Sequence, residues 1–239
     1  MDPEAAAARL RRQPPDAGHV AAFHGDPILL SIVEAAGWPI WPLILCSITA
    51  LAIVLERLNS LRVARVIPPR LLEEALAVSA VALPPPDTID KLERNSPLGR
   101  VLAAGFRGAR RPHASLESLR EDMENTGRAV MHGLQRYLNA LGTVASAAPL
   151  LGLLGTVVGL IEIFGSQSAG NANPLLLAHG ISVALYNTAF GLIIAVPSLM
   201  FYRYFRGRVD DFGIELEQAA RRLATHLQVQ LEAPRAPRT

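Results

Sequence analysis

The sequence predicts an all-α integral membrane protein with three transmembrane helices and long helical extensions in the cytoplasm. Apolar stretches at residues 38–55, 141–164 and 175–202 each approach the roughly 20 residues that an α-helix needs to cross a hydrocarbon core of about 30 Å. Within these stretches Glu162 is the only Asp, Glu, Lys or Arg. A buried core helix is the alternative for any one of them, and finding three in one chain favours membrane spans.

The arginines indicate the orientation of these spans. The segments 20–42 and 165–174 contain neither Lys nor Arg, whereas arginines follow the first span, precede the second and follow the third. The positive-inside rule therefore places the N-terminus and the short second loop outside, and the long first loop and the C-terminus in the cytoplasm. The residues that carry this asymmetry are Arg57, Arg62, Arg65, Arg70, Arg128, Arg136, Arg203, Arg206 and Arg208.

The N-terminal part divides into three segments. Residues 1–26 are rich in Ala, Arg and Pro and lack the apolar region of a signal peptide, so we expect either a disordered arm or a misplaced start of the sequence. Residues 27–37 have an amphipathic pattern and are expected to lie on the membrane interface. The first transmembrane helix is expected over residues 38–58, with Trp38 and Trp41 at the level of the lipid headgroups.

A cytoplasmic helical domain is expected over residues 59–140, because prolines divide this segment into short helices. Its last helix has a predicted capping box at Ser118 and Glu121. No helix breaker lies between this box and the start of the second span at residues 141–164. The sequence therefore predicts one continuous helix from about residue 115 to residue 164.

The C-terminal part is expected to form a periplasmic loop at residues 165–174, a third transmembrane helix at 175–204, and a cytoplasmic helix and tail at 205–239. In this last segment apolar residues recur among charged ones at helical spacing, so the third span is expected to continue as an amphipathic helix. These extensions are candidate contacts for neighbouring subunits. Simple solvated helices are the alternative.

The sequence lacks the motifs of common catalytic and metal sites, so neither an enzyme nor a cofactor is predicted. It has no phosphate-binding loop, no Cys and His cluster at metal-ligand spacing and no nucleophile elbow. The six histidines are scattered, and the single cysteine, Cys46, is expected to pack within the first span. Basic residues are balanced by acidic ones in the same segments, so nucleic-acid binding is not predicted.

Small residues form a stripe on one face of the second span and of the third. Such faces allow helix backbones to approach closely. Thr156, Thr188 and Asn187 lie beside the stripes near the middle of the spans, which predicts a polar seam that lines a path. The alternative for each Thr is a hydrogen bond to the carbonyl one turn back in its own helix. The packing residues are Ala148, Gly152, Gly155 and Gly159 in the second span, and Gly180, Ala184 and Gly191 in the third.

The segments that carry these features resemble the ExbB/TolQ/MotA proton-channel family, and within it most closely the biopolymer transport protein ExbB. The resemblance covers the chain from about Pro27 to the tail. It rests on the segments GWPIWPLILCS at 37–47, AIVLER at 52–57, APLLGLLGTVVG at 148–159 and GISVALYNTAFGL at 180–192.

The resemblance implies a homopentamer in the bacterial inner membrane, with a periplasmic N-terminus and a cytoplasmic C-terminus. In the family, the second and third helices of the subunits surround a pore that holds the membrane helices of a small single-span partner, ExbD, TolR or MotB. By their positions in the motifs, Thr156 and Thr188 correspond to the family's pore-facing threonines. The implied role is to couple, with an ExbD-like partner, the proton motive force to a TonB-like periplasm-spanning protein for outer-membrane transport.

One position departs from the family pattern. Well-known ExbB proteins carry a glutamate after Gly-Ile-x in the third span, where this chain has Val183. The chain then has no carboxylate at mid-depth, and the resemblance implies that the titrating acid is the aspartate of the partner's helix. Asn187 and Glu162 remain as polar candidates. Glu162, near the outer end of the second span, is expected either to be the group through which protons enter or to reach water at the interface.

Two other functions remain open. Within the family, a TolQ-like role in envelope integrity fits the same motifs. In a different class, the chain would be a scaffold that packs a partner's membrane helix and conducts nothing, and Val183 keeps this alternative open.

Overall fold

The structure, a computed structural model, describes residues 37–166 and 174–232, and this part of the chain consists of helices without strands. The all-α prediction is confirmed for these residues. The expected arm at 1–26, residues 27–36 of the amphipathic segment, residues 167–173 of the expected loop and residues 233–239 of the tail lie outside the described residues. The helices are α3 (Ile40–Ser60), α4 (Val63–Val66), α5 (Leu71–Val81), α6 (Pro86–Asn95), α7 (Pro97–Ala109), α8 (Leu116–Gln135), α9 (Leu138–Ser166) and α10 (Pro174–Glu232).

Three segments of the described chain are long and apolar enough to cross a membrane: α3 itself, a stretch from Leu116 to Gly165 that includes most of α9, and a stretch from Leu177 to Val229 within α10. They overlap the spans predicted at 38–58, 141–164 and 175–204. On α3, Leu45, Ile48 and Leu51 are exposed and recur every three residues or so on one face. An exposed apolar face with all backbone groups bonded inside the helix suits lipid, which offers no hydrogen-bonding partners.

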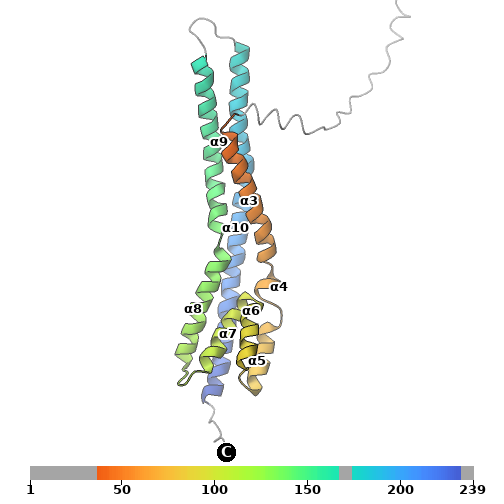
Figure 1. The fold of residues 1–239 in the computed structure, drawn as a ribbon, viewed down its shortest axis with the longest axis vertical. Coiled ribbons are helices and arrows are strands. Elements are labelled where there is room, and N and C mark those ends of the chain that lie inside the picture. Colours follow the sequence, from red (N-terminus) through yellow and green to blue (C-terminus); the bar gives the residue numbers. More distant parts are fainter. Residues whose placement is uncertain (1–36, 167–173, 233–239) are drawn as a thin grey trace, which may run out of the picture.

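α9 and α10 form an antiparallel hairpin, and α10 continues beyond it to the opposite end of the molecule (Figure 1). The 59 residues of α10 make a rod about 90 Å long at 1.5 Å per residue. α4 to α8 pack around the far part of this rod, and we call these helices together with α10 from Phe205 onward the helical base. One continuous helix therefore connects the hairpin to the base.

The helical base has a hydrophobic core of its own. α7 approaches α8 and α10 closely at Gly105, where a Cβ atom would lie 2.8 Å from the sulfur of Met123. α7 begins where it does because the side chain of Ser96 accepts a hydrogen bond of 3.0 Å from the N–H of Gly99, which satisfies a free donor of the first turn. The large buried side chains of this core include Phe106, Leu119, Met123, Phe205, Phe212 and Leu223.

α6 and α7 are joined by an ion-pair cluster on the surface of the base. Arg107 of α7 lies 2.7 Å from Asp90 and 2.5 Å from Glu93, both on α6. The hydrogen bond from Arg107, with its positive charge, holds the pKa of the Glu93 carboxyl below its ordinary value. The hydrogen bonds to Glu93 and Asp90 in turn raise the pKa of Arg107.

The continuous helix predicted from residue 115 to residue 164 is wrong. α8 ends at Gln135 and α9 begins at Leu138, with Arg136 (ψ 142°) and Tyr137 (φ 67°) outside helical geometry. Neither residue is Gly or Pro, so the local sequence carries no sign of the break.

The predicted capping box at Ser118 and Glu121 is also wrong, by three residues. The N-cap of α8 is Ser115, whose side chain accepts a hydrogen bond of 3.1 Å from the N–H of Ser118. The side chain of Ser118 accepts one of 3.1 Å from the N–H of Ser115 in return. This reciprocal pair satisfies two donors at the start of the helix, as a Ser and Glu pair does in the commoner form of the box.

Candidate functional site

Thr156 of α9 and Thr188 of α10 meet between the two arms of the hairpin. Their hydroxyl oxygens lie 2.5 Å apart. Each hydroxyl oxygen also lies 3.2 Å from the carbonyl oxygen of Gly152, and that of Thr156 lies 3.2 Å from the carbonyl oxygen of Ala184. The structure thus brings together the two threonines that the sequence analysis singled out.

The hydrogen bonds of this pair can run in two directions. Each hydroxyl has one hydrogen to donate and can also accept. Thr156 can donate to Thr188, which then donates to the carbonyl of Gly152. Alternatively Thr188 donates to Thr156, which then donates to the carbonyl of Gly152 or of Ala184. The pair can therefore reverse the direction of its hydrogen bonds while a backbone carbonyl remains the final acceptor.

A bond to the carbonyl one turn back, the alternative considered from the sequence, describes these residues incompletely. Thr156 does bond the carbonyl of Gly152 in its own helix, but it also bonds groups of α10. The bonds of Thr188 to Gly152 and Thr156 both cross to α9. Thr143, in contrast, is exposed on α9 and bonds the carbonyl of Asn139 one turn back at 2.9 Å.

Close packing of the two backbones brings the hydroxyls within reach of each other. A Cβ atom at Gly152 would lie 2.7 Å from the carbonyl oxygen of Asn187, and one at Gly191 would lie 2.6 Å from the carbonyl oxygen of Ala148. Both distances are too short for a real Cβ, and helix backbone cannot move aside as a side chain can. Packing therefore requires glycine at these two positions.

The other small residues continue the same contact, which we call the hairpin seam (residues 148–159 of α9 and 180–191 of α10). A Cβ at Gly155 would lie 2.8 Å from the Cβ of Asn187, and one at Gly159 would lie 3.2 Å from that of Ala184. Gly180 faces the side chain of Ile163. Asn187 is 2% exposed, so the structure places it inside the seam beside the Thr pair.

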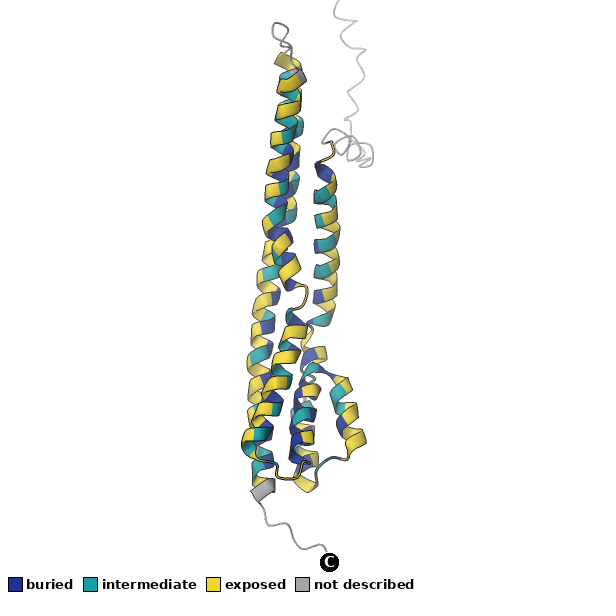
Figure 2. Ribbon diagram, turned by 60° about the vertical axis from the view of Figure 1, so that its left-hand side comes forward, coloured by how far each residue is buried: buried dark blue, intermediate teal, exposed yellow. Residues whose placement is uncertain are grey.

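The described part of α3 covers only one half of the seam. Leu43, one turn into α3, packs against Ala148 and Ala195, and α3 runs from there toward the base (Figure 1, Figure 2). Thr156 lies eight residues beyond Ala148, which is about 12 Å along the helix. The half of the hairpin that holds the Thr pair therefore lies beyond the described part of α3, and its exposed residues include Leu153, Leu154, Val157, Leu185 and Tyr186.

No carboxylate lies in the seam. Glu162 is exposed, six residues or about 9 Å beyond Thr156 along α9, and the sequence from 138 to 203 contains no other Asp or Glu. Val183 is half-buried beside Ala184 and offers no group that binds a proton. The described part of the seam therefore contains no carboxylate that could take up a proton beside the two hydroxyls.

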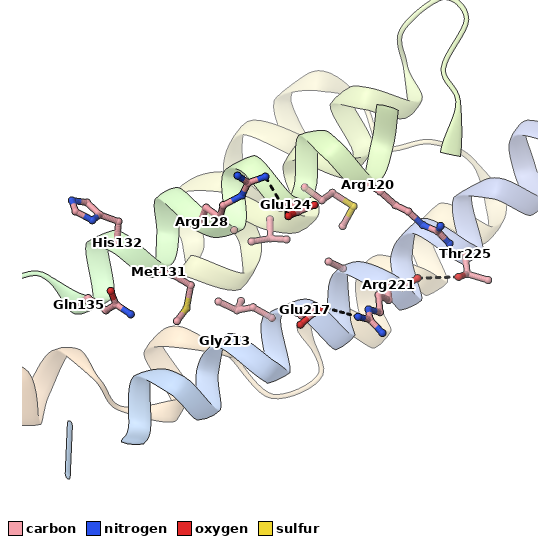
Figure 3. A pocket seen from close by; sticks show the side chains of 15 residues that line it. Arg120, Glu124, Arg128, Met131, His132, Gln135, Gly213, Glu217, Arg221 and Thr225 are labelled. Atoms are coloured by element: carbon pink, nitrogen blue, oxygen red, sulfur yellow. Dashed lines mark hydrogen bonds and ion pairs between the residues drawn. The ribbon is translucent and has the colours of Figure 1, made fainter. Parts of the chain in front are cut away.

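A groove of about 950 Å³ between α8 and α10 of the helical base is a second candidate site, which the sequence analysis missed (Figure 3). Arg128 pairs with Glu124 at 3.2 Å and Arg221 with Glu217 at 2.5 Å, so each ion pair stays on its own helix and none bridges the groove in Figure 3. The feature of the sequence that could have indicated this groove is a glycine in each of the two amphipathic helices, Gly127 and Gly213. The groove is lined by Val101, Met123, Met131, Leu216, Ala220, Arg120, His132, Gln135, Gly127, Gly213 and Thr225 in addition to these pairs.

Comparison with known proteins identifies relatives of this chain. A family described as the MotA/TolQ/ExbB proton channel family matches residues 93–218, which include the hairpin and most of the base. The chain is 33% identical over 174 residues to the biopolymer transport protein exbB1 of Vibrio cholerae serotype O1, covering 72% of this chain and 76% of that protein. It is 32% identical over 185 residues to an ExbB-like biopolymer transport protein of Synechocystis, covering 74% and 85%. It is 35% identical over 107 residues to the Tol-Pal system protein TolQ of Haemophilus influenzae, covering 43% and 47%.

Proposed function

Because the chain belongs to the MotA/TolQ/ExbB proton channel family, we propose that it is an ExbB-type subunit of a proton-driven complex in the bacterial inner membrane. With an ExbD-like single-span partner, it couples the proton motive force to a TonB-like protein that spans the periplasm. The energy so delivered drives transport across the outer membrane. The three apolar helices support the membrane location.

The Thr156 and Thr188 pair is the observation that carries this proposal. A proton that crosses a potential of 100 mV releases about 2.3 kcal/mol, but a path through lipid needs polar groups to carry it. The hydroxyl pair supplies such groups at 2.5 Å from each other. Since the seam contains no carboxylate, the titrating acid of the path comes from the partner's helix.

The partner's helix lies against the half of the hairpin that the described part of α3 does not cover. Five copies of the chain surround the partner's helices, with α9 and α10 facing inward. Asn187 borders the path beside the Thr pair, and Glu162 is the candidate group through which protons enter. The N-terminus is periplasmic, and the helical base and C-terminus are cytoplasmic, as the arginine asymmetry supports.

A TolQ-like role in envelope integrity is the second candidate function, and the similarity to TolQ of Haemophilus influenzae favours it. Restoration of activity in cells that lack either ExbB or TolQ separates the two roles. The ExbB-type role requires restored TonB-dependent uptake, and restored envelope integrity alone assigns the TolQ-type role.

The proposal is tested on the complex reconstituted in liposomes with its single-span partner. A potassium gradient with valinomycin imposes the potential, and a trapped pH-sensitive dye reports proton flux. We expect flux from the complete complex and its loss when the partner's membrane aspartate is replaced by Asn. An assembled complex without flux contradicts the proposal and favours the scaffold, for which Val183 remains the supporting feature.

A further inference from the structure

Arg57 is the one charged side chain that is buried among the described residues, at 4% exposure. It lies near the end of α3 where this helix reaches the base. A buried charge is costly unless other groups satisfy it. The groups that Arg57 contacts therefore indicate what it does there.

Arg57 supplies a donor to the break between α8 and α9. In a continuous helix the carbonyl of Leu134 would accept from the N–H of Leu138, but the chain leaves the helix at Arg136 and Tyr137. Nη1 of Arg57 donates to the carbonyl oxygen of Leu134 at 3.1 Å instead. A residue 77 positions away thus completes the end of α8.

Arg57 also holds the residue that makes the break. Tyr137 has a φ of 67°, which is unfavourable for a bulky L-residue. The guanidinium carbons of Arg57 and Arg136 lie 5.2 Å and 4.8 Å from the centre of its ring, within the range of cation–π attraction. Nε of Arg57 lies 2.8 Å from Oε2 of Glu56, without the alignment of a hydrogen bond.

The packing of the two arms differs on the two sides of this break. On one side the hairpin seam is so tight that Gly152 and Gly191 touch the backbone of the opposite helix. On the other side α8 and α10 pack through larger side chains and leave between them a groove of about 950 Å³ (Figure 3). α10 runs through both regions as one helix. The change in spacing coincides with the break in the other arm, where α8 leaves the direction of α9 (Figure 1).

We propose that Arg57 is a positioning residue that fixes the bend between α8 and α9 and so sets how α8 stands against α10. The guanidinium does this by replacing the hydrogen bond that the break removes and by stacking on Tyr137. Through this contact the first membrane helix controls the geometry of the groove while the seam stays closed. The inference concerns the bend itself and does not depend on the proposed proton path.

The test is a distance measured along the broken arm. Spin labels are placed at Asn125 of α8 and Leu150 of α9, both exposed, in a Cys46→Ser background, and labelled chains are diluted with unlabelled ones in the assembled complex. Pulsed electron paramagnetic resonance gives the distance. Arg57→Met removes the guanidinium, so the arm is expected to straighten and the distance to shift to longer values with a broader distribution. Arg65→Met, at an exposed arginine of α4, is expected to leave the distance unchanged.

A second substitution distinguishes positioning of the bend from a general loss of structure. Glycine adopts a positive φ without cost, so Tyr137→Gly should restore the original distance when it is combined with Arg57→Met. Arg57→Lys keeps the charge but loses the planar group that stacks on the ring, and we expect an intermediate distance. An unchanged distance in Arg57→Met, or in Arg57→Lys where the first variant does not accumulate, overturns the proposal. The proposal is also overturned if the distance in the double variant is no closer to that of the original protein than the distance in Arg57→Met.

Discussion

Gly191 of α10 lies directly against the carbonyl oxygen of Ala148 in α9, where an added Cβ atom would stand 2.6 Å away. Because backbone contacts backbone here, adding even a single methyl group to Gly191 should disturb the packing of the two helices. Gly191→Ala is expected to destabilise the protein by about 1–3 kcal/mol, the usual cost of overpacking. Unfolding in mild detergent measures this change.

Gly207→Ala is the matched control, because nothing lies within 4 Å of the Cβ position at Gly207 in the same helix. Alanine also has a higher helix propensity than glycine, so this variant should be neutral or more stable. Equal stabilities for the two variants would show that the close approach of α9 and α10 does not require glycine at position 191.

Thr156 and Thr188 should be energetically coupled. Replacing either with Val keeps the shape and leaves the other hydroxyl without its nearest partner, whereas replacing both removes the need for the bond. The free energies of unfolding of the two single variants and the double variant should therefore be non-additive, with a coupling of about 0.5–3 kcal/mol. Additive effects would mean that the 2.5 Å contact contributes no bond between the helices.

The orientation can be tested with single cysteines in a Cys46→Ser background. A cysteine at Ser168, in the connection between α9 and α10, should react with an impermeant thiol reagent in cells whose outer membrane has been permeabilised. One at Val81, which is 90% exposed in the helical base, should react only after lysis. Labelling of the cysteine at position 81 before lysis, with protection of the cysteine at position 168, would show that the orientation is opposite to the proposed one.

The ion pairs between α6 and α7 predict a dependence of stability on pH. The pKa of Glu93 is lowered in the folded protein, so its contribution is present above the unfolded value of about 4.3 and is lost as the pH falls through the folded value. The pair is exposed, and its contribution should stay below about 1 kcal/mol. The unfolding temperatures of the original protein and of Arg107→Met should differ at pH 6 and converge in acid. A difference that is constant with pH would assign the effect of Arg107 to packing.

The seam could be predicted from the sequence, whereas the bend could not, and the reason lies in the distance over which each is determined. The small residues from Ala148 to Gly159 recur at helical spacing, so the face that packs is visible in a short segment. The break at Tyr137 depends on Arg57, which lies far away in the sequence, and no local residue marks it. Hydropathy likewise predicts the length of α3 but not its position along the hairpin of α9 and α10. Only the structure shows that Leu43 lies beside Ala148.

The central claim is that the hydroxyls of Thr156 and Thr188 carry protons, and flux through the reconstituted complex tests it most directly. The variants are Thr156→Val, Thr188→Val, Thr188→Ser and Thr143→Val, each assembled with the partner in liposomes under an imposed potential. Ser at position 188 keeps the hydroxyl. Thr143 lies on the same hairpin, and its described hydrogen bond runs to the carbonyl of Asn139 in its own helix. We expect Thr156→Val to reduce flux and Thr188→Val to reduce it further, to the level of liposomes without the partner, while Thr188→Ser and Thr143→Val conduct. Full flux from assembled Thr156→Val and Thr188→Val complexes would contradict the account and leave the seam a packing surface.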